Sequence, residues 1–421
     1  MEQSIGPERH ENRDWPGLTD LATLADPAVI ADPYPLLARF REASPFTVLD
    51  GALVVFGSYD ACSRILRDPR ASSQRERSLL IPPEVADRDG QRRTRSFLSL
   101  DPPDHTRLRR LVARAFTPRV VATLMPRITM SAHDLLSAAA ERDEIELVSE
   151  LAYPLPVRII SELLGVPAQD HARFAGWSAK LAHSVQPSFG AIDPAGLAET
   201  EQAGLEFAEY FADLIAARRS SPADDLLTKL IRAEDAGDRL SVDELIATCV
   251  LLLVAGHETT VGLISNAMLA LLRNPAQLAA LIADPALAAG AVEETLRYDP
   301  PVQLTGRIAR GGMTIDGWQP REGAVLLLLL AATGRDPDIF ADPDTFDISR
   351  GAKEHLAFGA GPHFCLGAPL ARLEATIALQ AIVSRVAGPT LDESALVYKP
   401  NFNLRGPERM VVRFNEIRPS P

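Results

Sequence analysis

The sequence predicts a mainly α-helical fold with a long central helix and a small β-sheet region. We expect one domain over residues 21–421, preceded by a flexible N-terminal segment, residues 1–20. Three observations support this. The composition is that of an ordinary globular protein, with 46% hydrophobic and 24% charged residues. One apolar segment in the second half of the chain suits a helix that crosses a whole domain. Strand-like segments are few and short.

The central helix is expected over residues 242–273. Ser241 followed by Glu244 is a capping box at its start, and Asn274-Pro275 would end it. At about 1.5 Å per residue such a helix is roughly 50 Å long. Its centre, residues 248–256, is apolar all round, which is typical of a helix buried inside a core.

The remaining elements follow from periodicity and from turn residues. We expect helices over 33–43, 105–115, 122–140, 197–219, 275–283, 287–298 and 368–386. Short strands are expected over 52–56, 308–313, 314–315, 325–330 and 409–414, where Gly and Pro punctuate the chain. The 33 prolines interrupt loops and do not mark a linker. The pattern therefore favours one helical domain.

Charge and hydropathy exclude two classes of partner. The net charge of −13 argues against nucleic acid, because phosphate binding needs a basic surface. The longest apolar runs, 249–255 and 324–332, are shorter than the about 20 residues that span a bilayer. Residues 1–20 lack a basic segment followed by an apolar one, so we expect no membrane association and a cytoplasmic protein.

Positive charge is nevertheless concentrated in one region. Eight arginines lie between positions 92 and 119, with only two aspartates among them. On an acidic protein such a segment is either a solvated face or a docking patch for an anionic partner. The three cysteines, Cys62, Cys249 and Cys365, are too few and too scattered for a disulfide framework or a zinc cluster.

Cys365 has the surroundings of a thiolate site. It lies between Gly361 and Gly367, and a helix is expected to start at Ala368, with Pro369 in its first turn. The positive end of that helix would lower the pKa of the thiol. The glycines would let backbone N–H groups approach the sulfur and tune a bound metal. An isolated cysteine is more often buried and inert, so this pattern by itself leaves both interpretations open.

The spacing Phe358-x-x-Gly361-x-x-x-Cys365-x-Gly367 resembles the haem-binding signature of cytochromes P450. The resemblance implies the P450 fold and the cofactor haem b, iron protoporphyrin IX. It assigns Cys365 as the axial metal ligand, Phe358 as a shield for the sulfur and His363 as a partner of a haem propionate. A thiolate ligand donates electron density to iron and favours cleavage of the O–O bond. Cys62 and Cys249 would be ordinary core residues.

Other basic residues match propionate-binding positions of the same family. His105 and Arg109 lie four apart on one face of an expected helix, where a solvated basic stripe is the alternative. The resemblance assigns both to haem propionates, because a dianionic cofactor edge needs charged donors. Arg307 matches a further propionate-binding arginine.

Glu294 and Arg297 lie three apart and share one face of an expected helix. Such a pair is usually surface decoration. Upstream of the cysteine loop it resembles the Glu-x-x-Arg pair of cytochromes P450, a structural ion pair beneath the haem. Arg350 would be its third member, with His355 as the alternative.

The centre of the long helix carries polar residues that suit a buried helix poorly. It reads Ala-Gly-His-Glu-Thr-Thr at 255–260, and local inconsistency of this kind marks functional sites. Ala255 and Gly256 leave room for dioxygen, and a threonine hydroxyl there can bond a preceding carbonyl and open a kink. A simple packing groove with a paired glutamate is the alternative. The order resembles the oxygen-activation motif of cytochromes P450, which makes Glu258 a proton relay and Thr259 a stabiliser of activated oxygen. We expect His257 and Thr260 to pack or bond only locally.

The substrate site is inferred only by position. Residues 71–98 would form the loop above the haem, and residues 181–192 a mobile lid. A mostly apolar cavity, as ligand pockets usually are, would be lined by Ala255 and by Val254, Val302, Leu304 and Phe402. For each segment a place in the core or on the surface is an equal alternative.

The resemblance implies a monooxygenase that inserts one oxygen atom of O2 into a hydrophobic small molecule. Hydroxylation or epoxidation of a polyketide, macrolide, terpenoid or steroid-like compound is the favoured reaction. Electrons would come from an acidic ferredoxin with an NAD(P)H-dependent ferredoxin reductase, docked on the arginines of 105–119 and on Arg372. The alternatives are coupling, dehydration or isomerisation on the same fold, a thiol hydrolase built on Cys365, or a haem-binding protein without turnover.

Overall fold

The computed structural model describes residues 16–81, 96–182, 194–235, 237–315, 317–351 and 354–420. Most of the expected N-terminal segment, the centre of the expected loop over 71–98 and nearly all of the expected lid over 181–192 lie outside these residues. The last residues of the N-terminal segment, Leu18 to Asp20, belong to the first helix.

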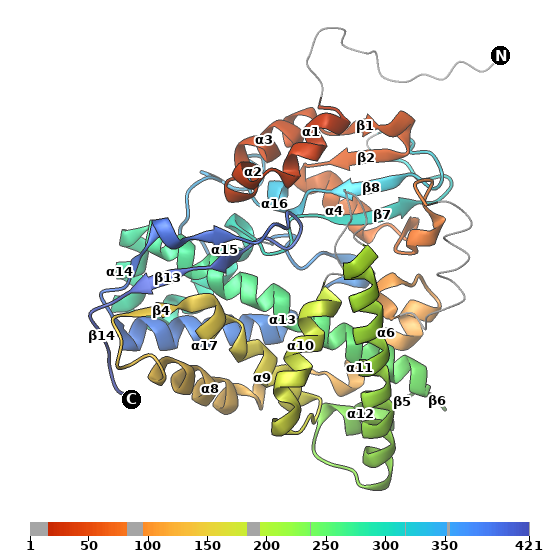
Figure 1. The fold of residues 1–421 in the computed structure, drawn as a ribbon. Coiled ribbons are helices and arrows are strands. Elements are labelled where there is room, and N and C mark those ends of the chain that lie inside the picture. Colours follow the sequence, from red (N-terminus) through yellow and green to blue (C-terminus); the bar gives the residue numbers. More distant parts are fainter. Residues whose placement is uncertain are drawn as a thin grey trace, which may run out of the picture.

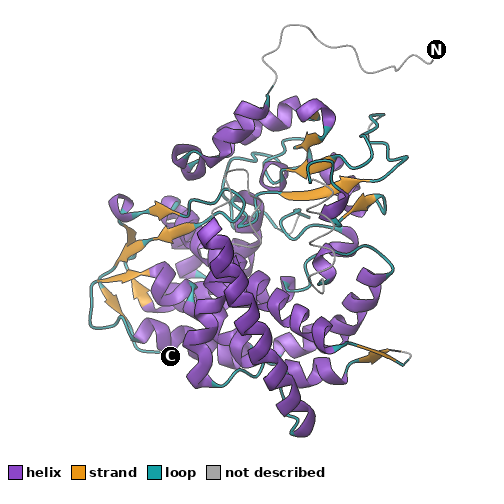
Figure 2. Cartoon of the chain, turned by 45° about the vertical axis from the view of Figure 1, so that its right-hand side comes forward, coloured by secondary structure: helices purple, strands orange, loops and turns teal. Residues whose placement is uncertain are grey.

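Helices make up the larger part of the molecule, as the sequence predicts, and the strands lie at its margins (Figures 1 and 2). The helices are α1 (Leu18–Ala22), α2 (Pro27–Ala31), α3 (Tyr34–Ala43), α4 (Tyr59–Arg67), α6 (Asp104–Ala115), α7 (Pro118–Ala122), α8 (Met125–Ser137), α9 (Pro154–Leu163), α10 (His171–Ala182), α11 (Pro194–Ser220), α12 (Leu226–Arg232), α13 (Val242–Arg273), α14 (Pro275–Ala283), α15 (Ala288–Tyr298), α16 (Leu330–Thr333) and α17 (Ala368–Arg385).

The largest sheet has the strand order β1-β2-β8-β7-β3 and lies beside α1–α3, away from the main helical body (Figure 1). Its strands are β1 (Phe46–Val48), β2 (Leu53–Phe56), β3 (Ala71–Ser72), β7 (Thr305–Ala309) and β8 (Val325–Leu328). β2 and β8 run parallel, the other neighbours antiparallel. All four residues of β2 are buried, in agreement with its uninterrupted apolar sequence.

The other strands form small sheets of two or three strands. They are β4 (Glu144–Glu146), β5 (Glu234–Asp235), β6 (Asp238–Arg239), β9 (Val386–Ala387), β10 (Thr390–Leu391), β11 (Val397–Tyr398), β12 (Pro407–Arg409), β13 (Val411–Arg413) and β14 (Glu416–Ile417). β4 pairs with β13, which joins two segments more than 260 positions apart. The sheets therefore bring the C-terminal segment back onto the helical body.

Several predicted boundaries differ from the structure. The expected helix over 122–140 starts at Met125, because Pro126 has no N–H and suits only a first turn. The expected strand over 308–313 instead ends at Ala309, and Ile315 forms only an isolated bridge with Trp318. The helices not predicted from the sequence are α1, α2, α4, α7, α9, α10, α12 and α16.

The central helix α13 has the predicted bounds. Its capping box is present, with the Ser241 hydroxyl accepting from the Glu244 N–H at 3.2 Å and the Glu244 carboxylate accepting from the Ser241 N–H at 2.8 Å. By length and composition α13 would pass for a membrane span, but half of its most apolar stretch is buried. It packs against α9, α10, α11, α15 and α17, so it is the core helix of the molecule.

Candidate active site

The cysteine loop lies between a single turn of 3-10 helix, Gly361–His363, and α17. The Cys365 N–H donates to the Phe358 carbonyl at 2.9 Å, which closes the loop. Backbone N–H groups of Gly367 and Ala368 point at the Cys365 sulfur, as the sequence predicts. Gly361 has φ +68°, and a Cβ there would lie 2.4 Å from the Leu66 carbonyl oxygen, so only glycine fits.

Burial raises the pKa of the Cys365 thiol above its usual value, although those N–H groups and the nearby Arg109 and Arg372 act to lower it. We expected a lowered pKa from the helix terminus alone. The expectation was wrong for the protein without its metal, because loss of hydration outweighs the helix and the two arginines. A metal that binds this sulfur must displace the proton itself. Cys62 and Cys249 are fully buried, as expected of core residues.

Phe358 covers one side of the loop and is itself covered by an arginine. The Arg372 guanidinium lies 4.6 Å from the Phe358 ring centroid. Glu293 holds Arg372, with 2.5 Å between Oε1 and Nε, and also accepts from His355 at 3.2 Å. Burial acts to raise the pKa of Glu293, but the hydrogen bonds from His355 and Arg372 lower it to about 2. His355 therefore belongs to this cluster and not to the ion pair of Glu294.

Basic side chains from α6, from β7 and from the turn Gly361–His363 converge beside Cys365. The rings of His105 and His363 are 4.1 Å apart, and His363 Nε2 lies 3.1 Å from the Ser73 hydroxyl. Burial, and then the charges of Arg307, His105 and Arg109, lower the pKa of His363 to about 3. The predicted propionate-binding residues are thus gathered in one place.

This basic cluster is short of acceptors. Both ring nitrogens of His105 are buried and have no hydrogen-bond partner among the described residues. Burial lowers the pKa of Arg307 to about 10, and Arg307 donates only to the Thr305 hydroxyl and the Gly306 carbonyl within the described chain. Buried donors and cations that lack partners need an anionic group among them. The donor set therefore fits the carboxylate edge of a haem.

The centre of α13 combines tight packing with an open surface. Ala255 is exposed although it lies in the middle of the core helix. A Cβ on Gly256 would meet only Ile160 Cδ1, at 3.9 Å, so the helix borders open space here. The Thr259 hydroxyl donates to the Ala255 carbonyl at 2.8 Å. The threonine thus bonds the preceding turn as expected, and all residues of this segment belong to α13.

Glu258 is held by two basic side chains. Its Oε2 accepts from Lys399 Nζ at 2.6 Å, and its Oε1 lies 3.4 Å from His257 Nε2. Burial acts to raise the pKa of Glu258, but the hydrogen bond from His257 and the charge of Lys399 lower it to about 2. His257 bonds the Leu253 carbonyl, as expected of a local contact, and additionally reaches this carboxylate.

Thr260 extends the polar cluster to the helix behind the cysteine. Its hydroxyl donates to the Gly256 carbonyl at 2.9 Å and contacts Glu374 of α17. Glu374 is 1% exposed, and its Oε2 has no partner among the described residues. Burial raises the pKa of Glu374 to about 8. Thr260 was expected to bond only locally, and this expectation was wrong because α17 packs directly against α13.

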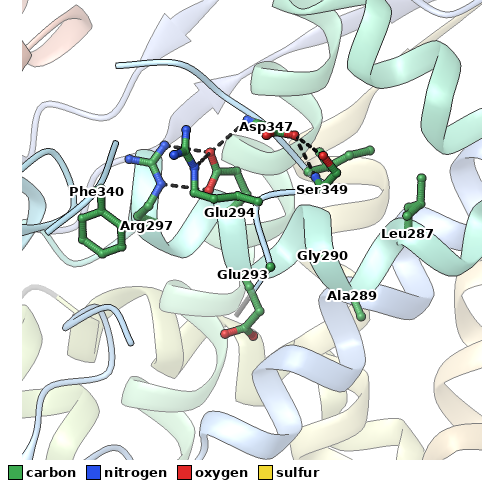
Figure 3. Close-up of a pocket in the computed structure, with 12 residues that line it drawn as sticks. Leu287, Ala289, Gly290, Glu293, Glu294, Arg297, Phe340, Asp347 and Ser349 are labelled. Atoms are coloured by element: carbon green, nitrogen blue, oxygen red, sulfur yellow. Dashed lines mark hydrogen bonds and ion pairs between the residues drawn. The ribbon is translucent and has the colours of Figure 1, made fainter. Parts of the chain in front are cut away.

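Glu294, Arg297 and Arg350 form the predicted ion network (Figure 3). Arg297 donates twice to Glu294, at 2.8 and 2.7 Å, and Arg350 Nε lies 3.2 Å from Glu294 Oε1. Arg297 also donates to the carbonyls of Gly334, Pro343 and Thr345. The network therefore ties α15 to the segment that leads into the cysteine loop.

The expected pocket residues lie in different parts of the core. Val254 belongs to the helical core, whereas Leu304 and Phe402 pack together beside the sheet, at 3% and 9% exposure. Val302 is half-buried and forms an isolated bridge with Leu404. Of the five, Ala255 alone is exposed, so the structure brings only part of this set to an open surface.

Sequence reasoning missed four residues of the site. Ser73, Glu293, Lys399 and Glu374 contact His363, Arg372, Glu258 and Thr260. Glu374 alone left a signal, because an acid amid the apolar residues of an expected helix is unusual. The other three are polar residues of the kind that is common on protein surfaces, so nothing in the sequence marks them. They join the site only through tertiary contacts.

Comparison with known proteins agrees with this geometry. Residues 46–387 match the family model described as Cytochrome P450. The chain is 42% identical to the cytochrome P450 monooxygenase PikC of Streptomyces venezuelae over 416 residues, which cover 96% of each protein. It is 40% identical to the vitamin D(3) 25-hydroxylase of Pseudonocardia autotrophica, over 90% of this chain and 93% of that one.

A solved structure gives the same result. The crystal structure of Mycobacterium smegmatis CYP164A2 in its ligand-free state matches with a TM-score of 0.86 at 46% identity, over 94% of this chain and 100% of that one. The signature around Cys365, the basic cluster short of acceptors and the polar centre of α13 together fit a haem-thiolate site. The chain belongs to the cytochrome P450 family and is a haem-dependent P450 monooxygenase.

Proposed function

We propose that the enzyme inserts one oxygen atom of O2 into a hydrophobic small molecule of the polyketide, macrolide, terpenoid or steroid-like type, by hydroxylation or epoxidation. Its similarity to PikC and to a vitamin D(3) hydroxylase supports this substrate class. One observation carries the proposal: the half-buried Cys365 sulfur receives two backbone N–H groups, and an acid and a threonine lie half-buried at the centre of α13.

In this proposal ten residues hold the haem. Cys365 binds the iron, and Phe358, Gly361 and Gly367 enclose the sulfur. His105, Arg109, Arg307 and His363 bind the propionates, in keeping with the buried ring nitrogens of His105, which have no partner among the described residues, and with the buried charge of Arg307. Ala255 and Gly256 border the open side of the site. Once bound, the haem supplies reductive activation of dioxygen, which the side chains present do not provide.

The side chains of the protein itself then deliver protons and hold the site in place. Glu258 is the acid that passes protons toward the Thr259 hydroxyl, and Thr259 is held in place by its bond to the Ala255 carbonyl. Glu294, Arg297 and Arg350 act structurally, since each is tied to backbone carbonyls or N–H groups of the loop before Cys365. Val254, Val302, Leu304 and Phe402 are the proposed substrate contacts, which requires the substrate to reach side chains that lie in different parts of the core.

The electron donor in this proposal is an acidic ferredoxin with an NAD(P)H-dependent ferredoxin reductase, in the cytoplasm. The basic face of α6 beside the cysteine loop supports it, because complementary charge steers association. Arg109 reaches the Phe364 carbonyl next to Cys365, and Arg110 is exposed. Arg372 contributes less than the sequence suggests, because Glu293 compensates its charge.

The first test is spectroscopic. Purified protein with haem should give a red-shifted ferrous carbon monoxide complex, typical of a thiolate ligand, and Cys365→His should lose that band while retaining haem. A panel of macrolides, terpenoids and steroids is then screened for a shift of the ferric spectrum, and hits are turned over with ferredoxin, reductase and NADPH. A wild-type protein without the red-shifted band, or hits converted only to coupled or dehydrated products, contradicts the proposal.

The electron donor is tested separately. Arg110→Glu should slow reduction by the ferredoxin and weaken its dependence on salt, without changing substrate affinity. The matched control is Arg418→Glu, which makes the same charge change at the exposed C-terminal end, away from α6 (Figure 1). Equal reduction rates in the two variants contradict docking on α6.

A further inference from the structure

His257 lies next to the relay acid and is completely enclosed. Its side chain is 0% exposed, compared with 14% for Glu258 and 21% for Lys399. The His257 ring packs edge-on against Tyr153, with 5.7 Å between the ring centroids. Three titratable groups thus extend from the surface at Lys399 through Glu258 to the interior at His257, although only Glu258 belongs to the recognised motif.

The hydrogen bonds of the ring decide which nitrogen carries a proton. His257 Nδ1 lies 2.9 Å from the Leu253 carbonyl oxygen, which can only accept, so Nδ1 must carry a hydrogen. In a neutral ring Nε2 would then be a bare lone pair facing the Glu258 Oε1 at 3.4 Å. Two acceptors facing each other in a buried site repel. A proton between Nε2 and Oε1 removes this conflict.

Lys399 determines where that proton rests. Its ammonium group holds the other oxygen of Glu258 at 2.6 Å, which favours the ionised carboxylate. Lys399 therefore engages one oxygen of Glu258 while the other faces His257 Nε2, an arrangement that favours a shared proton on the His257 side. Glu258 can donate toward Thr259 only after it receives this proton and releases Lys399.

We propose that His257 and Glu258 share one exchangeable proton, so that His257 is a second proton carrier of the relay and Lys399 a positioning residue for Glu258. This inference rests on the proposed role of Glu258. In the step itself the N–H bond at His257 Nε2 breaks as the O–H bond at Glu258 Oε1 forms, with no change of oxidation state. Glu258 then gives the proton toward Thr259, and a proton taken up from solvent at the partly exposed Glu258 carboxylate returns to His257 Nε2.

The proton can be observed without turnover. The ferrous carbon monoxide complex of the holoenzyme is diamagnetic, so nitrogen-15 spectra of labelled histidine report the protonation of each ring. His257→Gln identifies the His257 signals. In the wild type we expect both nitrogens of His257 to be protonated at neutral pH, and in Glu258→Gln we expect Nε2 to lose its proton. A neutral His257 with a bare Nε2 in the wild type overturns the proposal.

Turnover gives the second readout. His257→Gln keeps a hydrogen-bonding side chain but cannot carry a proton, so product formation should fall by up to about a hundredfold. NADPH consumption should continue with release of hydrogen peroxide, and the solvent isotope effect should increase. The matched control is His171→Gln, since His171 is half-buried and, among the described residues, bonds the Val166 carbonyl far along the chain from the relay. Coupling equal to the wild type in His257→Gln overturns the proposal.

Two variants of Lys399 distinguish a role in positioning Glu258 from simple support of the fold. Lys399→Arg should retain coupling, whereas Lys399→Gln should shift the His257 nitrogen signals and lower coupling at unchanged haem content. Unchanged signals in Lys399→Gln contradict the positioning role. If the wild type lacks the thiolate carbon monoxide band or forms no oxygenated product, the proposed function fails, while the histidine spectra still decide the proton assignment.

Discussion

Glu374 should make the stability of this protein depend on pH in an unusual direction. It is 1% exposed, and Thr260 is its partner among the described residues, so burial raises its pKa to about 8 from the ordinary 4.5. A group whose pKa is raised by folding contributes stability that is fully present below the unfolded pKa. That contribution is lost as pH rises through the folded pKa.

The size of the effect follows from the shift. Each pKa unit corresponds to about 1.4 kcal/mol, so the free energy of unfolding should fall by up to about 5 kcal/mol between about pH 4.5 and pH 8 through Glu374 alone. Glu374→Gln removes the ionisation and keeps the shape of the side chain. The variant should therefore gain stability relative to the wild type as pH rises.

Urea unfolding of the two proteins, followed by circular dichroism, measures this difference. Between about pH 5.5 and about pH 8 the stability of Glu374→Gln relative to the wild type should increase by about 3 kcal/mol. Glu408→Gln, a change at an exposed carboxyl, should show no such increase. If the difference in free energy of unfolding between Glu374→Gln and the wild type is constant over this pH range, Glu374 is not a buried neutral acid and the reasoning is refuted.

The remaining predictions concern the ion network and two glycine sites. Glu294→Gln should lower the free energy of unfolding by about 3–5 kcal/mol, because Arg297 stays buried without its counter-charge, and urea unfolding measures this. Gly334→Ala should lower the melting temperature and the haem content, since its Cβ would lie 2.0 Å from the Arg297 carbonyl oxygen. In the control Gly306→Ala the added Cβ meets nothing within 4 Å, so this variant should behave as the wild type. Equal melting temperatures of the two variants contradict the prediction. Gly256→Ala should raise the free energy of unfolding by about 1 kcal/mol, because alanine favours a helix more than glycine does. The variant should nevertheless form product more slowly, because its methyl group enters the open side of the site. An unchanged rate of product formation contradicts the role of Gly256.

Local chemistry explains what could be predicted from the sequence. The capping box of Ser241 and Glu244 and the Asn274-Pro275 stop lie within or beside α13, so its bounds were predicted correctly. The cysteine loop is similarly local, because the Phe358 carbonyl accepts from the Cys365 N–H and the N–H groups of Gly367 and Ala368 meet the sulfur. Weak periodicity does not explain the helices that were missed, since α4 and α9 each have a clear apolar face.

What the sequence by itself determined is the haem-thiolate loop, the polar centre of the core helix and the mainly helical fold, since each depends on residues close together in the chain. Only the tertiary structure decided the charge state of the site. Lys399 lies 141 positions from Glu258, and Glu374 meets Thr260 only because α17 packs on α13. Burial then determines the direction of the pKa shifts of Cys365 and Glu374, and burial arises only when distant segments exclude water together.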